Sequence, residues 1–591
     1  MNGTHGRILV VDLNAKRFLI EPIPEDVQQD WLGGKGLASR LLYDMNPPGV
    51  DPLSPENRII FACGPFAGTP MWGGSRYGVF TKSPLTGAYA ESYSGGKTPE
   101  ALDAAGFDAV VLWGRAPKTT VLAVHPQGCS FHEAVDLQGM ETLETEEAVL
   151  ERFAFRREEF SRSGAVVIGP AGEAMLPFAV IANDRRHCAG RTGVGAVLGS
   201  KNVKGMVFAG DRKRPLHDAA AVRAFAKNFM REHSNSPGVK AYRARGTTQM
   251  VALMNTVGAF PARYWSQGTC DHWEAISGDR YHEEHDVRPS ACLKCFMACG
   301  RKATIRSGRH RGLSIEGPEY ETIYAFGGLC MIRDMAEIAW LNDLCDRLGL
   351  DTITAGNLCG LAMEAASRGR LDLDITYGDA DGAASLIRDM AAGRGVGRIF
   401  ARGITAAARE LDLDDLAVHV KGLEPAGYEP RVLKGMGLSY AVSPRGACHL
   451  RTTFYKAELA GMIDPDTVHG KAAMVVDFED RLVLFDCLVL CRFFRDMYQW
   501  EPLCEAISLV TGLPADVDAM RDRVRRVCDL VRRFNLREGL NAGHDKLPRR
   551  LTSEALPSGH RLDEDEMQTL LLEYYSARGW DADGVPPDQN G

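Results

Sequence analysis

The 591-residue sequence has no apolar run of membrane length and no excess of basic residues. Its first six residues are mostly polar, and the apolar run 8–11 ends at Asp12, which is too short for a signal peptide or a membrane span. The formal net charge is −8, and an acidic chain is a poor partner for nucleic acid. We therefore predict a globular protein that binds neither nucleic acid nor membrane.

An export signal is also missing, although the chain has 15 cysteines. Thiols without an export signal are typical of the reducing cytoplasm, so we expect a cytoplasmic location. In the glycine-rich run 189–199, three residues rather than two separate Gly195 from Gly199, which excludes the Rossmann fingerprint. Three shorter glycine clusters are typical either of turns or of backbone that approaches a ligand closely. These clusters are 33–36, 73–74 and 95–96.

Three cysteines stand within eight residues, at Cys292, Cys295 and Cys299. Thiolates are soft ligands that bind iron–sulfur clusters, zinc or copper. Zinc would need a fourth ligand, for which His282 or His285 could serve, but such sites usually combine two short pairs rather than a triplet. We therefore predict a [4Fe–4S] cluster whose fourth ligand comes from elsewhere in the chain.

The order of the patterns predicts an α+β protein. Residues 1–212 form a β-rich domain, 213–424 a helical domain that holds the cysteine triplet, and 425–591 a helical C-terminal domain. The N-terminal strands follow alternating and apolar patterns between turn signals. They are expected as a hairpin at 7–13 and 16–20, then at 58–63, 77–82, 109–113, 120–124 and 164–168.

Two consecutive helices are predicted in the middle domain. The apolar residues of the first recur every three or four positions, as on one face of a helix. They are Met335, Ile338, Leu341, Cys345 and Leu348. Gly349 is expected to cap this helix, and the second helix is predicted at 354–367.

The end of the first helix has an echo later in the chain. The segment Asp346-x-x-Gly-Leu-Asp351 corresponds to Asp486-x-x-Val-Leu-Cys491. Taken alone, the first segment is also typical of a surface turn with capping aspartates. The echo indicates instead that two similar groups are held near each other.

Together these features resemble the tungsten-dependent aldehyde:ferredoxin oxidoreductase family over nearly the whole chain. The order and spacing of several motifs carry the resemblance. They are Gly33-Gly34-Lys35-Gly36, Gly73-Gly74-Ser75-Arg76, the cysteine triplet, Gly317-Pro318-Glu319-Tyr320-Glu321-Thr322, the two echoing segments, Phe534-Asn535-Leu536-Arg537-Glu538-Gly539 and Tyr574-Tyr575-Ser576-Ala577-Arg578-Gly579-Trp580.

The resemblance implies an N-terminal saddle of β-sheets that carries a pterin cofactor, followed by two mainly α-helical domains. A tungsten ion, with molybdenum as an alternative, is held there between two pterins beside a [4Fe–4S] cluster. The echoing segments become the pterin-binding motifs, and an ionised aspartate suits the N–H donors of a pterin edge. Their binding residues are Asp346, Leu350, Asp351, Asp486 and Leu490, and Cys491 becomes the fourth cluster ligand. The second motif has Val489 where the family usually has glycine.

Further cofactor contacts follow from the resemblance. The positions that contact pterin or phosphate match Arg76, Gly95, Ala189, Gly190 and Arg191, and Arg445 stands where a related basic residue lies. Arginine suits phosphate because its guanidinium forms two parallel hydrogen bonds. A Mg²⁺ ion that bridges the pterin phosphates would use backbone oxygens near Tyr93 and Ala189. The chain departs from the family at Tyr93 and Cys188, where the family has asparagine and arginine.

Two residues are implied as catalytic. Glu321, which precedes Asp346 by 25 residues as in the family, matches a general base toward water or the aldehyde hydrate. His449 matches a histidine that hydrogen-bonds the substrate oxygen or transfers a proton. Judged alone, Glu321 is also typical of a helix start and His449 of a buried core histidine. An interface iron of some relatives is not expected, because no histidine lies between His310 and His419.

The resemblance thus predicts oxidation of a small aldehyde to a carboxylic acid. Electrons would pass through the cluster to ferredoxin or to an iron–sulfur electron-transfer subunit, in a homo-oligomer or heteromer. One alternative is the catalytic subunit of a tungsten-type aromatic acyl-CoA reductase, which shares this fold. The other is a non-catalytic iron–sulfur or zinc-binding scaffold.

Overall fold

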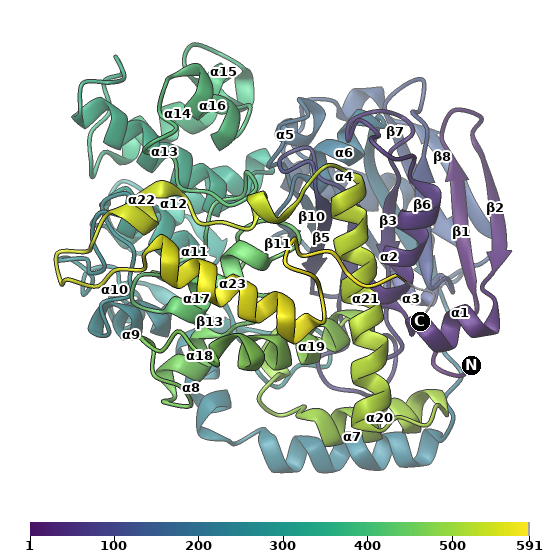
Figure 1. Ribbon diagram of the computed structural model, residues 1–591. Coiled ribbons are helices and arrows are strands. Elements are labelled where there is room, and N and C mark those ends of the chain that lie inside the picture. Colours follow the sequence, from purple (N-terminus) through teal and green to yellow (C-terminus); the bar gives the residue numbers. More distant parts are fainter. Residues whose placement is uncertain (589–591) are drawn as a thin grey trace.

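A computed structural model describes residues 1–588 of the chain (Figure 1). The first 210 residues contain two six-stranded sheets, and most of the remaining chain is helical. The predicted α+β class is therefore confirmed. Among the described residues, no helix is both long enough and apolar enough to span a bilayer.

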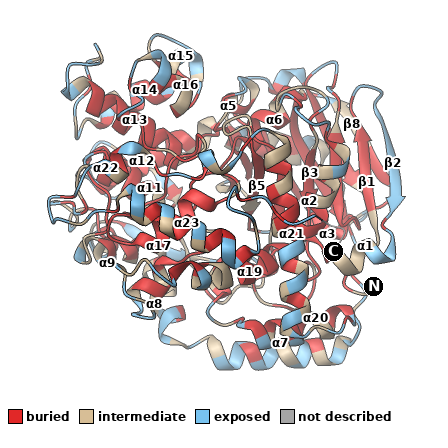
Figure 2. Cartoon of the chain, in the orientation of Figure 1, coloured by how far each residue is buried: buried red, intermediate tan, exposed pale blue. Residues whose placement is uncertain are grey.

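The first sheet contains the predicted hairpin. Its strand order is β2-β1-β6-β3-β4-β5. β1 pairs antiparallel with β2, with Arg7 opposite Pro22, and parallel with β6. β2 is an edge strand whose six residues are all exposed, as Figure 2 shows. The strands are β1 (Arg7–Asp12), β2 (Arg17–Pro22), β3 (Ile59–Ala62), β4 (Tyr77–Lys82), β5 (Tyr89–Ser94) and β6 (Ala109–Trp113).

The second sheet has the order β11-β10-β9-β12-β7-β8. β12 lies at its centre, parallel to β7 and antiparallel to β9. The strands are β7 (Thr120–His125), β8 (Gly128–Glu133), β9 (Arg162–Val167), β10 (Ile181–Asn183), β11 (His187–Ala189) and β12 (Val203–Gly210).

The two sheets stack face to face because successive strand residues point to opposite sides. Leu9 and Phe61 of the first sheet share a core with Phe208 of the second. The alternate residues, such as Ile8 and Ile60, face away and pack against helices α2 (Gly34–Met45) and α21 (Val517–Arg537). Helix α4 (Thr142–Phe153) covers the outer face of the second sheet. The N-terminal region is thus four layers thick, and a C-terminal helix completes one of them.

A third, three-stranded sheet lies in the region that was predicted to be mainly helical. β13 (Asp286–Ser290), β14 (Gly300–Thr304) and β15 (Ser314–Glu316) pair antiparallel. These strands are short and half exposed, so they carry little of the apolar periodicity from which strands are predicted. Ser290 is opposite Gly300, so the 291–299 segment with the cysteine triplet is the loop of this hairpin.

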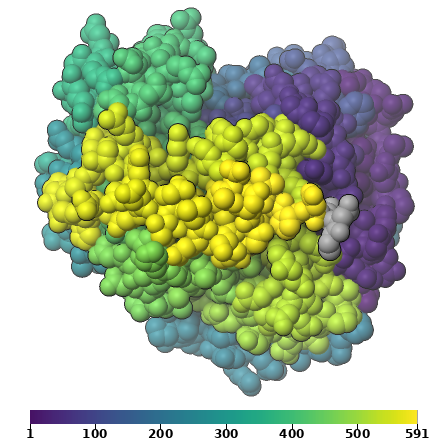
Figure 3. Space-filling model, viewed as in Figure 1, coloured from purple at the N-terminus to yellow at the C-terminus, as the bar shows by residue number. Residues whose placement is uncertain are grey.

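Helices form the rest of the described chain. One core cluster joins residues from Ala171 to Tyr575, and the predicted division at residue 424 stays a prediction. The C-terminal chain covers one face of the molecule (yellow in Figure 3). The longer helices are α7 (Ala219–His233), α8 (Pro237–Arg245), α12 (Met335–Leu348), α13 (Thr352–Ser367), α14 (Ala380–Ala392), α17 (Lys434–Val442), α19 (Lys471–Leu488), α20 (Trp500–Thr511) and α23 (Glu564–Arg578). The shorter helices are α1 (Glu25–Trp31), α3 (Thr98–Ala104), α5 (Pro170–Glu173), α6 (Val194–Ser200), α9 (Met250–Thr256), α10 (Gly278–Glu284), α11 (Tyr320–Ile323), α15 (Gly397–Phe400), α16 (Ile404–Glu410), α18 (Tyr455–Leu459) and α22 (Arg549–Ser553).

Candidate active site

Two adjoining cavities lie where the N-terminal sheets meet the helices. The larger has a volume of about 400 Å³ and the smaller about 230 Å³. They adjoin because seven residues line both. These are Arg76, Arg186, Cys188, Glu316, Glu319, Cys491 and Phe493.

The smaller cavity is lined by all four predicted cluster ligands. Cys292, Cys295 and Cys299 come from the β13–β14 loop, and Cys491 comes from the segment after α19. Lys294 and Ala298, which directly precede Cys295 and Cys299, have a left-handed backbone conformation, with φ of 51° and 49°. Such turns wrap the loop around the cavity.

The thiols surround a space instead of converging on one point. Within residues 1–588 no three His, Cys, Asp or Glu side chains come close enough to hold a single metal ion. A cluster that brings its own sulfides needs such room between its thiolates, whereas zinc binds its ligands directly at about 2.3 Å. Burial raises the pKa of Cys292, Cys295 and Cys299, and the charge of Cys491 raises them further. The geometry therefore suits a [4Fe–4S] cluster better than the zinc alternative.

The two echoing segments have the same backbone conformation. α12 and α19 each end in a left-handed cap, at Gly349 (φ 78°) and Val489 (φ 54°). The following residue, Leu350 or Leu490, donates its N–H to the carbonyl five residues earlier, at 2.9 and 2.8 Å. Each segment thus forms the same helix C-terminal motif. The residues that end the segments, Asp351 and Cys491, each begin a further helical turn.

The glycine cluster 33–36 allows close packing against the second segment. A Cβ atom on Gly34 would lie 2.4 Å from the Asp486 carbonyl oxygen. One on Gly64 would lie 2.1 Å from the Leu488 carbonyl oxygen. Lys35, which follows Gly34 in the chain, is buried, and its Nζ lies 3.0 Å from Glu91 Oε1. Close contact between backbones explains this glycine cluster.

The predicted pterin-binding aspartates are each held by protein groups. Asp351 caps α13, accepting from the Ile353 N–H, and pairs with Arg191 Nε at 3.0 Å. The capping interpretation is therefore correct for Asp351, although the residue is buried and not at the surface. Asp346 accepts from Asn342 Nδ2 at 2.8 Å, and burial raises its pKa to about 7.

Asp486 belongs to a network of buried charges. Its Oδ2 lies 2.7 Å from Arg451 Nη1 and 2.5 Å from Arg492 Nη2. Arg451 also lies 2.7 Å from Glu91, the partner of Lys35. These attractions lower the pKa of Glu91 against the effect of its burial. The network links the first sheet to the second segment beneath the cavity.

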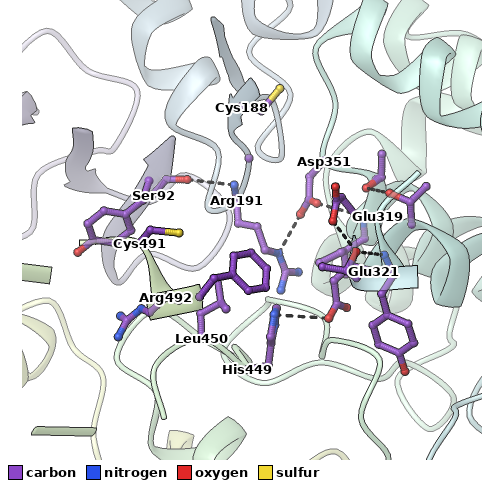
Figure 4. Close-up of a pocket in the computed structure, with 18 of the residues that line it drawn as sticks. Ser92, Cys188, Arg191, Glu319, Glu321, Asp351, His449, Leu450, Cys491 and Arg492 are labelled. Atoms are coloured by element: carbon purple, nitrogen blue, oxygen red, sulfur yellow. Dashed lines mark hydrogen bonds and ion pairs between the residues drawn. The ribbon is translucent and has the colours of Figure 1, made fainter. Parts of the chain in front are cut away.

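Glu321 and His449 come together on the wall of the larger cavity (Figure 4). Glu321 lies in α11, and its Oε2 accepts the Gly427 N–H at 2.9 Å. Its Oε1 lies 3.5 Å from His449 Nε2. Within residues 1–588 neither Glu321 Oε1 nor His449 Nδ1 has a hydrogen-bond partner. Both groups are thus available to a bound molecule.

Burial also sets the charge of this pair. It raises the pKa of Glu321 to about 8. It lowers the pKa of His449 well below its usual value, and four surrounding arginines, Arg191 first among them, lower it further. At neutral pH the pair therefore contains a carboxylic acid and a neutral imidazole, which together can exchange one proton with a substrate.

Most of the predicted site residues line the two cavities, and three do not. Gly95 stands behind Cys292, whose Sγ would lie 3.0 Å from a Cβ on Gly95. Ala189 ends β11 and is fully buried. Leu350 packs into the large helical core. The predicted residues on the walls are Arg76, Gly190, Arg191, Asp346, Asp351, Arg445, Asp486, Leu490, Glu321, His449 and the four cysteines.

Two predicted contacts have protein partners. Arg76 donates from Nη2 to the Tyr93 carbonyl at 3.3 Å, and its Nη1 lies 4.0 Å from Cys491 Sγ. The Tyr93 oxygen that was proposed for Mg²⁺ is therefore engaged by Arg76. Arg191 is bound by Asp351 and by the Glu424 carbonyl at 2.9 Å.

Sequence reasoning missed several arginines on these walls. Arg186 precedes β11 and lines both cavities. It stands two positions before Cys188, and at the position of Cys188 the family has arginine. Because alternate strand residues share a face, the two-residue spacing was a usable signal. Arg495 lines the larger cavity, and no motif pointed to it. Glu319 also lines both cavities and accepts from the Thr247 hydroxyl.

Comparison with known proteins agrees with this arrangement. A model of the aldehyde ferredoxin oxidoreductase N-terminal domain matches residues 8–210, and a model of domains 2 and 3 of the same family matches 224–590. Tungsten-containing aldehyde ferredoxin oxidoreductase from Pyrococcus furiosus is 33% identical, over 100% of this chain and 98% of its own length. The Thermococcus kodakarensis protein of that name is 32% identical, over 99% and 98%.

More distant relatives share the length of the chain. An aliphatic sulfonate oxidoreductase, WOR-like subunit, from Pyrococcus furiosus is 26% identical, over 100% of this chain and 96% of its own. A solved structure of the active-site complex BamBC of benzoyl coenzyme A reductase with 1,5-dienoyl-CoA superposes with a TM-score of 0.82 at 21% identity, covering 99% of this chain and 96% of that one. The last match shows the fold alone. The family models and the relatives at 32–33% identity together show that this chain is an oxidoreductase of the aldehyde ferredoxin oxidoreductase family.

Proposed function

We propose that this chain oxidises aldehydes to carboxylic acids at a tungsten or molybdenum centre held by two pterins. The single observation that carries the proposal is the Glu321–His449 pair, which faces one cavity while four cysteines surround the adjoining one. The overall change is aldehyde plus water to carboxylic acid, two protons and two electrons. One cavity supplies groups that move protons, and the other supplies ligands for a cluster that accepts electrons.

The larger cavity fits an anionic, hydrogen-bonding cofactor. Buried guanidinium nitrogens on its walls have no hydrogen-bond partner within residues 1–588, among them Arg445 Nε and Arg451 Nε. Unpaired buried donors are costly, and phosphate groups would satisfy them. Asp346 and Asp486 lie on the same walls as acceptors. These residues would hold the pterins and a Mg²⁺ ion, and tungsten or molybdenum would supply the Lewis-acid and redox chemistry.

Glu321 and His449 would handle the protons. In its ionised form Glu321 accepts a proton from water or from the aldehyde hydrate through the free Oε1. His449 stays neutral, because burial and the arginines disfavour the imidazolium. It can therefore accept a hydrogen bond from a hydrate hydroxyl, while Glu321, whose Oε1 lies 3.5 Å from its Nε2, takes the proton.

The electron acceptor would approach the cysteine loop. Leu293, between the first two thiols, is 41% exposed, and Lys294 beside it is partly exposed. A ferredoxin or an iron–sulfur subunit docked here would lie against the loop that holds three of the ligands. We infer that this face is the electron exit, in a homo-oligomer or a heteromer.

The test is elemental analysis of anaerobically purified protein together with turnover of several aldehydes and a viologen acceptor. The proposal expects one tungsten or molybdenum and about four irons per chain, with aldehyde-dependent viologen reduction. Metal-loaded protein that oxidises no aldehyde but reduces an aromatic acyl-CoA would support the acyl-CoA reductase instead. Protein without tungsten or molybdenum would support the non-catalytic scaffold.

A further inference from the structure

Arg495 presents an unpaired cation to the larger cavity. It is 3% exposed, and within residues 1–588 its Nε has no hydrogen-bond partner. Its Nη1 donates to the Arg492 carbonyl at 2.7 Å, and its Nη2 lies 3.4 Å from the Tyr455 hydroxyl. Its nearest carboxylate oxygen in the described chain is Asp496 Oδ1, at 3.9 Å, on a side chain that is 58% exposed. That distant, solvated carboxylate offsets little of the buried charge.

The other arginines on these walls are paired more closely. Arg191 and Arg186 each have a carboxylate oxygen at 3.0 Å. Arg451 and Arg492 both reach Asp486 within 2.7 Å. Arg445 reaches the Cys448 thiol at 2.8 Å. Arg495 and Arg76 are therefore the two arginines on these walls without a close carboxylate or thiol partner. Arg76 lies beside the cysteines, so Arg495 is the one that can serve a substrate at the catalytic pair.

Arg495 is joined to the catalytic pair by a row of aromatic rings. The Tyr455 ring stacks on Tyr428, with centroids 4.2 Å apart and planes at 16°. Tyr428 in turn lies 5.4 Å from the His449 ring. All of these residues line the larger cavity. A substrate that lies along this row would place one end at Glu321 and His449 and the other at Arg495.

We propose that Arg495 determines specificity by binding a second, anionic group on the aldehyde, a carboxylate or a phosphate. This inference rests on the proposed aldehyde oxidation. The free Nε–H would donate to an oxygen of that group, and Tyr455 would donate from its hydroxyl. A hydrogen bond to a charged group in a dry site is worth enough to change affinity tenfold or more. The rings between the two ends favour an aromatic or flat spacer.

The test compares aldehydes that differ only in the distal group. For wild-type enzyme we expect kcat/KM for 4-carboxybenzaldehyde or a formylphenyl phosphate to exceed that for the methyl ester or the methyl ether by about tenfold or more, mainly through KM. Whichever anion is preferred identifies carboxylate or phosphate as the natural group. Arg495→Gln should abolish the preference, and Arg495→Lys should keep part of it. Equal kcat/KM for charged and neutral aldehydes in the wild type would overturn the proposal.

Two further readouts separate this idea from other roles. Metal and pterin content of Arg495→Gln should equal that of the wild type, because a loss would assign Arg495 to the cofactor and overturn the proposal. Calorimetric binding of terephthalate against benzoate needs no turnover. Tighter binding of terephthalate, lost in Arg495→Gln, supports the anion site even if aldehyde oxidation itself fails. Equal binding of the two acids contradicts it.

Discussion

At the scale of single residues, burial decides which groups in the larger cavity are charged at neutral pH. It raises the pKa of Glu321 to about 8 and that of Asp346 to about 7. His449 stays neutral, because burial and four surrounding arginines lower its pKa. The cavity thus offers positive charge for anions and, at Glu321, a carboxyl group that loses its proton under mildly alkaline conditions.

The state of Glu321 leads to a pH-dependent prediction. A base must be ionised to act, so kcat/KM should rise with pH and level off above a pKa of about 8. Glu321→Gln, which preserves shape but not basicity, should lower kcat by ~10²–10⁴-fold and remove this rise. Glu319→Gln is the matched control, because glutamine can still accept the Thr247 hydroxyl and the change should cost much less. Metal content should be unchanged in both variants. A fully loaded Glu321→Gln enzyme with near-normal kcat would exclude Glu321 as the base.

The Glu321–His449 pair could be predicted from sequence, whereas Arg495 could not. Glu321 and His449 stand in motifs whose order along the chain resembles a known family. Arg495 follows the second segment in a stretch without such a motif. Its importance depends on Tyr455 and Tyr428, which approach it only in the folded chain. A buried arginine without a close carboxylate partner can be recognised only when its neighbours in the fold are known.

At the scale of elements, the left-handed cap of α12 fixes the path of the first segment. Gly349 has φ of 78°, and a Cβ atom there would lie 3.1 Å from the Gly169 nitrogen. Gly393 caps α14 with φ of 64° but has open space around it. The two glycines therefore share a backbone conformation and differ in packing.

This difference can be measured. Gly393→Ala should lower the free energy of unfolding by about 1 kcal/mol, because a Cβ is strained in the left-handed region. Gly349→Ala should cost a further ~1 kcal/mol or more, because the backbone at Gly169 must shift as well. Denaturant titrations of both variants and the wild type provide the comparison. Equal losses would show that α12 has no close packing at its cap.

Several helices and strands could be predicted from sequence, whereas β5, the central strand β12 of the second sheet and the short hairpin were not. The three- and four-residue periodicity predicted α12 from Met335 to Leu348, and the structure confirms it with the Gly349 cap. The apolar runs of β1, β4 and β6 were likewise found where expected. β13 to β15 were not predicted. They are strands because they pair with one another, and their residues show no pattern from which strands are predicted.

At the scale of the whole molecule, the fold gathers four cysteines from distant parts of the chain. Three come from one hairpin loop, and Cys491 follows α19 almost 200 residues later. The buried network from Lys35 through Glu91 and Arg451 to Asp486 holds that segment against the first sheet. The resemblance to the family predicted the fourth cysteine, whereas this network needed the structure, since its members are scattered over 450 residues.

The fourth ligand is tested by Cys491→Ser. Loss of one thiolate should remove or destabilise the cluster and lower bound iron well below about four per chain. Cys504→Ser, a buried cysteine in α20 that lines neither cavity, should leave iron content unchanged. Iron analysis and EPR spectra of the reduced proteins measure both. Full iron and an unaltered spectrum in Cys491→Ser would mean that another residue completes the cluster.

The central claim is that an aldehyde oxidised in one cavity delivers its electrons to the cluster in the other. The direct measurement is anaerobic rapid mixing of oxidised, metal-loaded protein with an aldehyde and no external acceptor, followed by visible absorbance and EPR. We predict bleaching of the iron–sulfur absorbance and a reduced-cluster EPR signal at a rate no slower than kcat, and much slower formation of both in Glu321→Gln. A protein with its full tungsten and iron whose cluster stays oxidised with every aldehyde would contradict the account.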